Sequence, residues 1–151
     1  WLRVGMLAVL VFVCSHAVLH LRVYPIGREM LQHAERRELV DWVSTQTPSG
    51  SVFLIETEIE HRFFDFERRT RRASLFFHRF TPGSSADIRQ WYQRHLLRER
   101  VMAKGCDSAD SKLRIDYLIA SAETAERLAA TCGPIVHESG EFRVVEFQRP
   151  G

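Results

Sequence analysis

An apolar segment near the start of the chain constrains its organisation most strongly. Val4 to Leu21 is interrupted by only three clearly polar residues, which are Ser15, His16 and His20. An eighteen-residue helix is about 27 Å long, close to the hydrocarbon thickness of a bilayer. Arg3 and Arg22 flank the segment, and a helix breaker, Pro25, follows it. The sequence therefore predicts a transmembrane helix with a short linker over residues 1–27.

A secretory signal peptide is the alternative interpretation of this segment. Ser15-His16-Ala17 would then be its cleavage site, with small residues at the two key positions. The apolar run continues beyond Ala17 to Leu21, which favours the membrane span. Because the chain begins with Trp1 and not Met, we also expect it to be a fragment or a processed product with further chain upstream.

His16 and His20 are four residues apart and share one helix face. Such a pair suits a metal or haem site, or packing against neighbouring transmembrane helices. No third ligand is identifiable, so we favour packing. This interpretation makes the segment the last span of a larger protein.

Residues 28–151 are predicted to form one soluble domain, because helical and strand-like segments alternate along them. In chain order we expect a helix over Arg28–Gln46, strands over Ser51–Thr57 and Ala73–Phe80, a helix capped by Ser84 with an apolar face of Ile88, Trp91, Tyr92 and Leu96, a strand over Leu113–Ala120, a short helix capped by Ser121, and strands over Ile135–His137 and Phe142–Phe147. This order predicts an α/β fold. We expect a small three-layer α/β sandwich with a mixed, mostly parallel sheet of about five strands and a C-terminal β-hairpin.

The motifs of common enzymes are absent. The sequence has no phosphate-binding loop, dinucleotide fingerprint or Gly-x-Ser-x-Gly elbow, so we predict no catalytic residue and no cofactor. A net charge of +2 gives no reason to expect a nucleic-acid partner. Asp65-Phe66-Glu67 has carboxylate spacing that suits a divalent metal, but such pairs are common by chance, so we predict no metal site.

Two charged segments are candidate binding sites. Glu56 lies near the carboxyl end of the first predicted strand, where open α/β sheets bind ligands, and we expect it to share one face of an extended segment with Glu58 and Glu60. A small polar or cationic ligand and a solvated strand extension are the two interpretations. Four arginines, Arg68, Arg69, Arg71 and Arg72, suit either a lipid-headgroup phosphate or an exposed charged turn.

Cysteine use bears on the compartment. Cys106 and Cys132 form a disulfide if the domain is extracytoplasmic, and are otherwise two free, buried thiols. The sequence leaves both interpretations open.

Several stretches of the domain resemble a known family. They are Asp41-Trp42 leading to Thr47-Pro48, Ser51 to Ile55, Arg71-Arg72 before Ser74 to Phe77, and Trp91-Tyr92-Gln93-Arg94. They resemble a C-terminal domain of unknown function that follows the last span of bacterial multi-pass membrane proteins, which are similar to integral-membrane glycosyltransferases using polyprenyl-phosphate sugar donors. The resemblance implies an extracytoplasmic domain at the bacterial inner membrane that does not catalyse a reaction by itself.

The expected function follows from this resemblance. It is an accessory domain of a multi-pass, glycosyltransferase-like membrane protein, with Arg71, Arg72, Trp91, Tyr92 and Arg94 as binding positions. Its expected partners are membrane lipid, transmembrane helices of the same parent chain, and a lipid-linked phosphate or glycan acceptor. The alternative is a single-span, membrane-anchored binding or interaction module of the bacterial envelope.

Overall fold

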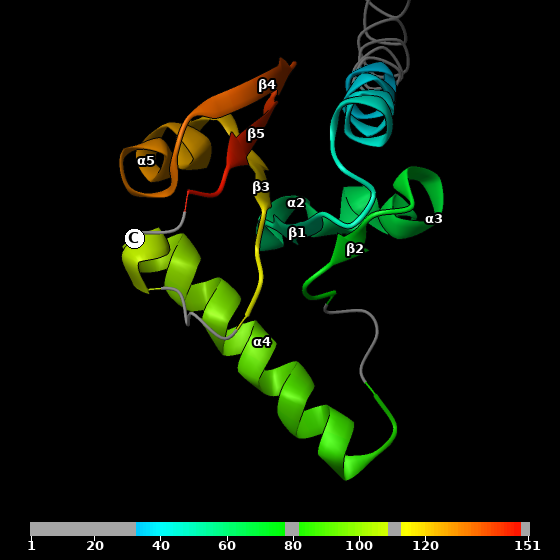
Figure 1. The fold of residues 1–151 in the computed structure, drawn as a ribbon, viewed down its shortest axis with the longest axis vertical. Coiled ribbons are helices and arrows are strands. Elements are labelled where there is room, and N and C mark those ends of the chain that lie inside the picture. The colour runs from blue at the N-terminus through cyan, green and yellow to red at the C-terminus, as the bar shows by residue number, and fades with distance from the viewer. Residues whose placement is uncertain (1–32, 78–81, 109–112, 149–151) are drawn as a thin grey trace, which may run out of the picture. The chain divides into compact units, whose positions relative to one another are not determined.

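A computed structural model describes residues 33–77, 82–108 and 113–148 of the chain (Figure 1). The predicted transmembrane segment Val4–Leu21, with Cys14, His16 and His20, lies outside these residues. Within the described ranges, no helix is both long enough and apolar enough to cross a membrane. The chain divides into two units, Trp1–Ala34 and Glu35–Gly151, and the account that follows concerns the second.

One mixed sheet of five strands organises the described part of this unit. Its order is β2-β1-β3-β5-β4. Strand β1 is parallel to both its neighbours, β2 and β3, whereas the pairs β3–β5 and β4–β5 are antiparallel. The strands are β1 (Val52–Ile55), β2 (Ala73–Ser74), β3 (Tyr117–Ser121), β4 (Ile135–Ser139) and β5 (Phe142–Glu146). The predicted α/β fold with a mixed sheet and a C-terminal hairpin is confirmed, but parallel and antiparallel pairings are equally represented.

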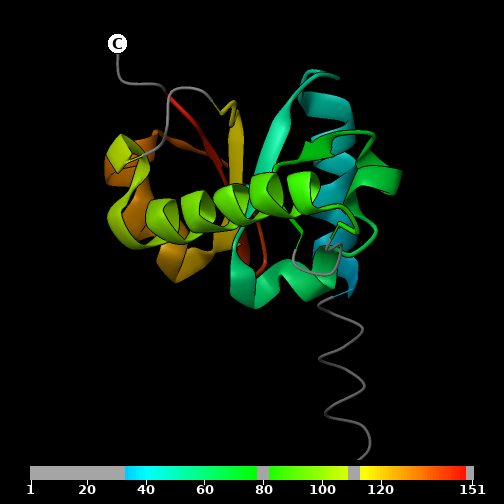
Figure 2. The ribbon, with the colours of Figure 1, turned by 90° about the horizontal axis from the view of Figure 1, so that it is seen from below.

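Helices cover both faces of the sheet. They are the helix over 33–46, then α2 (Thr57–Glu60), η1 (His61–Phe63), α3 (Phe66–Thr70), α4 (Ser85–Lys104), η2 (Cys106–Ser108) and α5 (Ala122–Cys132). The helix over 33–46 packs on one face together with the segment from α2 to α3. On the other face lie α4 and α5, and Figure 2 shows α4 crossing the sheet.

Alternation along the strands builds the two cores. Phe53 and Ile55 of β1 join the cluster under the helix over 33–46, while Leu54 between them joins the cluster under α4 and α5. The same alternation recurs in β3, where Ile119 faces the first cluster and Leu118 the second. Burial on both faces explains why β1 and β3 are nearly continuous apolar runs.

The segment after β1 corrects one prediction. Glu58 does not continue a strand, because Thr57–Glu60 is helical. Ile59, Phe63 and Phe66 are all buried, and their spacing of four and three residues brings them to one side of a helical path. Burial of this apolar set overrides the alternation of glutamates.

A helix cap and a hairpin turn form as the sequence predicts. The Ser84 hydroxyl accepts a hydrogen bond of 3.2 Å from the Asp87 amide and so caps α4. Gly140 turns the β4–β5 hairpin with a φ of 56°. A Cβ at Gly140 would lie 1.9 Å from Cδ of Glu35, so both the backbone conformation and the close approach require glycine there.

Candidate functional site

Glu56 occupies the position where open α/β sheets commonly bind ligands, at the carboxyl ends of β1 and β3. It is only 6% exposed. Its carboxylate accepts hydrogen bonds from the Ser121 amide, at 2.6 Å, and from the Thr124 hydroxyl. Ser121 stands at the N-cap of α5 as predicted, but its own side chain makes no capping bond. Glu56 therefore caps α5, which gives it a structural role.

Arg72 also has a structural role. It is 9% exposed, and its guanidinium donates to the carbonyl oxygens of Ser44, Thr47 and Thr70 at 2.6 to 3.1 Å. The bonds to Ser44 and Thr47 satisfy carbonyls at the end of the helix over 33–46, and the bond to Thr70 satisfies one at the end of α3. Arg71, in contrast, is exposed and adopts a left-handed conformation that ends α3.

The carboxylates of Asp65 and Glu67 serve different partners. Asp65 pairs with Arg36, whereas Glu67 accepts a hydrogen bond of 2.8 Å from the Ser74 amide. Ser74 belongs to the edge strand β2, so Glu67 satisfies an amide that faces away from the sheet. The described residues contain no cluster of His, Cys, Asp and Glu that would hold a metal ion.

A buried polar network fixes α4 on the sheet. Arg98 is fully buried, pairs with Glu60, and lies over the Phe76 ring at 4.2 Å from its centroid. Glu99 accepts from the Thr57 hydroxyl at 3.1 Å, and its carboxylate lies 3.6 Å from Arg98 Nε. These contacts anchor the C-terminal half of α4 through α2.

The N-terminal half of α4 is far less covered. Residues 83–90 are all exposed, and Figure 1 shows this end of the helix extending away from the sheet. Two hollows, each of about 380 Å³, lie beside α4, one along its N-terminal half and the other along its middle. Both hollows bring chemically diverse side chains together.

The first hollow, here called the β2-side hollow, lies between α4 and the edge strand. Three aromatic residues and two carboxylates contribute to its lining, namely Phe76, Phe77, Trp91, Glu67 and Asp87. Trp91 Nε1 donates a 3.2 Å hydrogen bond to the Phe77 carbonyl, which fixes the orientation of the indole ring. The hollow thus contains an aromatic surface of fixed orientation beside carboxylate oxygens.

The second hollow, here called the Leu113-side hollow, has a different lining. Its charged groups are Arg94 and Arg100, and its apolar ones are Leu96, Leu97 and Leu113. Gln90 and Arg94 line both hollows, so they form the boundary between them. The Arg94 Nε is buried and has no hydrogen-bond partner in the described part of the chain.

Only two of the binding residues that the sequence predicts lie together in the structure. Trp91 and Arg94 lie together in the β2-side hollow, whereas Tyr92 lines neither hollow and is 52% exposed. Glu56, Arg71 and Arg72 do not line either hollow. Sequence reasoning missed Asp87, Gln90 and Glu67. Asp87, Gln90, Trp91 and Arg94 follow the spacing of one helix face, a signal that a search for apolar stripes overlooks.

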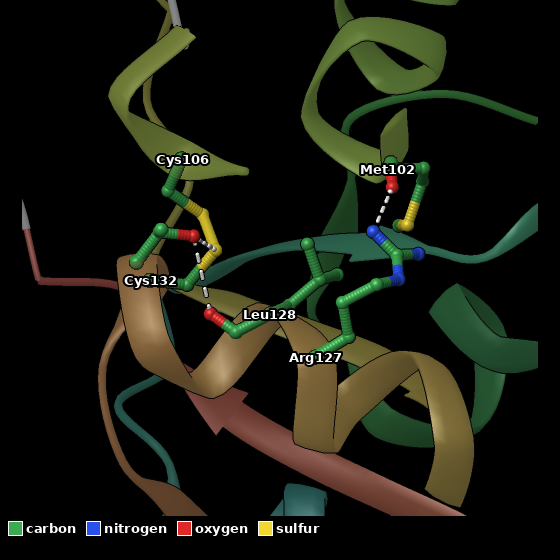
Figure 3. The surroundings of a disulfide bond; sticks show 6 residues. Met102, Cys106, Arg127, Leu128 and Cys132 are labelled. Carbon is green, nitrogen blue, oxygen red and sulfur yellow. Dashed lines mark hydrogen bonds between the residues drawn. A yellow bond between two sulfur atoms is a disulfide. The ribbon is translucent and has the colours of Figure 1, made fainter. Parts of the chain in front are cut away.

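A disulfide joins Cys106 and Cys132 (Figure 3). It connects η2, just after α4, to the last residue of α5. Nearby, Arg127 of α5 donates a 2.7 Å hydrogen bond to the Met102 carbonyl of α4. The C-terminal end of α4 is therefore fastened to α5.

Comparison with protein families, characterised proteins and solved structures finds no match to this chain.

Proposed function

We propose that this chain is an accessory, extracytoplasmic domain of a membrane protein that binds a glycan in the hollows beside α4. The compartment is supported by the Cys106–Cys132 disulfide, because lasting disulfides belong to oxidising compartments. It is also supported by the predicted membrane span over Val4–Leu21. The parent protein we propose is the multi-pass, glycosyltransferase-like protein that the resemblance implies.

The lining of the β2-side hollow is the observation that carries this proposal. A sugar ring presents C–H groups on its faces and hydroxyl groups around its edge. Trp91 offers a large, oriented aromatic surface for the faces. Glu67 and Asp87 offer acceptors for hydroxyl groups, and Arg94 offers a donor. A concave site with a few oriented polar groups is typical of small-ligand binding.

Binding fits these side chains better than catalysis does. Glu67 already accepts from the Ser74 amide, and Asp87 forms a 2.6 Å hydrogen bond with the Ser84 hydroxyl. A carboxylate held in this way retains lone pairs for a ligand hydroxyl, and both side chains are exposed to solvent and not enclosed in a pocket. The role we propose is to hold the glycan acceptor, or the carbohydrate part of a lipid-linked phosphate, for the parent enzyme.

Calorimetric titration with soluble oligosaccharides of the bacterial envelope tests this proposal. We expect Trp91→Ala and Arg94→Gln each to weaken binding by about tenfold, the loss of one well-made contact. Tyr92→Ala is the matched control, because it removes an aromatic ring from the same helix outside both hollows. Equal affinities of the Trp91→Ala variant and the unmodified chain would contradict the proposed site.

The compartment has its own test. Glu123 is exposed at the start of α5, so a cysteine placed there is accessible to reagents. We expect a membrane-impermeant maleimide to label Glu123→Cys in intact spheroplasts as fully as in lysed ones. Labelling only after lysis would place the domain in the cytoplasm and contradict the proposal.

A further inference from the structure

The outer side of α4 carries an apolar stripe that the fold does not use. Ile88, Tyr92 and Leu96 follow one another at intervals of four residues and are 42%, 52% and 41% exposed. The inner side of the same helix buries Leu97 and Val101. The stripe is therefore additional to the core-facing side, although the sequence alone suggests that it is the buried one.

Cations border this stripe. Arg89, Arg100 and Lys104 are exposed and lie toward one flank of the outer side of α4. The helix also carries two exposed carboxylates, namely Asp87, which bonds to Ser84, and Glu99, which accepts from Thr57 and lies along the same outer side. The three exposed cations outnumber these two carboxylates, so the exposed side chains of α4 carry a net positive charge.

We infer that the outer side of α4 docks on an anionic membrane surface. In this arrangement Ile88, Tyr92 and Leu96 enter the boundary between headgroups and acyl chains, and Arg89 and Lys104 approach lipid phosphates. Basic helices with one apolar side bind lipid surfaces in this way, and tyrosine favours the same depth. The exposure of residues 83–90 leaves this end of the helix clear to approach a bilayer.

Two further arguments, the first of which rests on the proposed membrane span, favour a bilayer over a second protein. The predicted span ends at Leu21, and the fourteen residues to Glu35 reach at most about 50 Å, so the tether keeps the domain near the membrane. A stable protein interface buries about 1,200 Å² or more, and three half-exposed side chains supply a small part of that area. For a tethered domain, a weak contact with lipid is sufficient.

This inference rests on the proposed membrane span but not on glycan binding, because Ile88 and Tyr92 line neither hollow. Leu96 of the stripe also lines the Leu113-side hollow. The test uses the full chain reconstituted in nanodiscs of phosphatidylglycerol or of phosphatidylcholine, with hydrogen exchange followed by mass spectrometry. We expect exchange over residues 85–96 to be about tenfold slower in the anionic nanodiscs only. Equal exchange in the two lipids, or failure of the chain to co-purify with anionic nanodiscs, would overturn the inference.

Variants identify the surface. The triple change Ile88→Ser, Tyr92→Ser and Leu96→Ser should abolish the protection. Val136→Ser should retain it, since Val136 is a comparably exposed apolar residue on β4. If the triple variant keeps its protection, the stripe is not the docking surface.

A second pair of variants tests the charge. Arg89→Gln with Lys104→Gln should reduce the protection about tenfold, whereas Arg69→Gln with Arg71→Gln removes two exposed cations from the α3 region and should not. The reverse result would assign membrane contact to the α3 region. Protection that rises with protein concentration in neutral detergent would identify a second copy as the occupant and overturn the inference.

Discussion

Arg98 of α4 and Glu60 of α2 form an ion pair inside the protein, with 0% and 8% of their side chains exposed. The Arg98 guanidinium also lies over Phe76, and two of its nitrogens, Nε and Nη2, have no hydrogen-bond partner in the described part of the chain. A buried cation so sparsely bonded depends strongly on its carboxylate, because transfer from water to the protein interior costs several kcal/mol per ion.

Removal of Glu60 should therefore be severe. We expect Glu60→Leu to lower the free energy of unfolding by about 3–5 kcal/mol, since the buried Arg98 then keeps only the more distant Glu99 carboxylate, 3.6 Å from Nε, as a counter-ion. The double variant Glu60→Leu with Arg98→Met should be less destabilised than Glu60→Leu alone. Urea denaturation of the four proteins of this cycle measures the coupling, and a double variant that is less stable than either single one would contradict it.

The disulfide should stabilise the domain measurably. Cys106 and Cys132 are separated by 26 residues. A closed loop of this size reduces the entropy of the unfolded chain by an amount worth about 3.5 kcal/mol. We expect Cys106→Ser with Cys132→Ser to lower the free energy of unfolding by roughly that amount. In this double-serine variant, dithiothreitol should no longer change the unfolding midpoint, and a persistent effect would implicate another disulfide.

The sequence predicts those parts of the fold that depend on local patterns. The strand of Val52–Ile55 is an apolar run, and the Ser84 cap depends on residues three apart. The helical segment α2–α3 escaped prediction because two patterns compete there. Alternating glutamates suggest a strand, while Ile59, Phe63 and Phe66 have helical spacing, and only the packed core decides between them.

Long-range pairing limited the prediction of the site. Trp91 and Arg94 share one helix, so their proximity is readable from spacing. Glu67 reaches the same hollow from α3, which depends on how β2 pairs with β1. The apolar pattern of α4 indicates the wrong buried face for the same reason, because Ile88, Tyr92 and Leu96 are exposed. Arg98 is tolerated in the core because it pairs with Glu60, 38 residues away, and no local sequence pattern predicts that partner.

Arg72 should matter for stability. Its guanidinium donates to four backbone carbonyls and to the Thr47 hydroxyl. We expect Arg72→Lys to cost about 2–3 kcal/mol in the free energy of unfolding, because a single ammonium group does not span acceptors that the planar guanidinium bridges. Arg71→Gln is the neighbouring control and should change stability by less than about 0.5 kcal/mol, as at other exposed positions. Comparable losses in both variants would argue against a specific role for Arg72.

His137 should make stability depend on pH. Its ring stacks on Trp42, with centroids 4.5 Å apart and planes 8° from parallel. Burial lowers the pKa of His137 below the ordinary histidine value of 6.5, although Glu38 and Glu138 partly oppose this shift. The unfolded chain therefore binds the proton more readily than the folded protein. Stability is retained above about pH 6.5 and falls as the pH drops below it toward the lower pKa of the folded state.

We expect the urea concentration at the unfolding midpoint to fall as the pH is lowered from 7.5 to 5.5. Asp and Glu side chains titrate largely below this window, which isolates the histidines. The variant His137→Gln keeps a planar polar group beside Trp42 but does not titrate, so its midpoint should change less over the same range. The pKa of His137 is measured directly by NMR from the imidazole carbon-bound proton. A value above 6.5 in the folded protein would show that Glu38 and Glu138 outweigh burial, and stability would then rise as the pH falls.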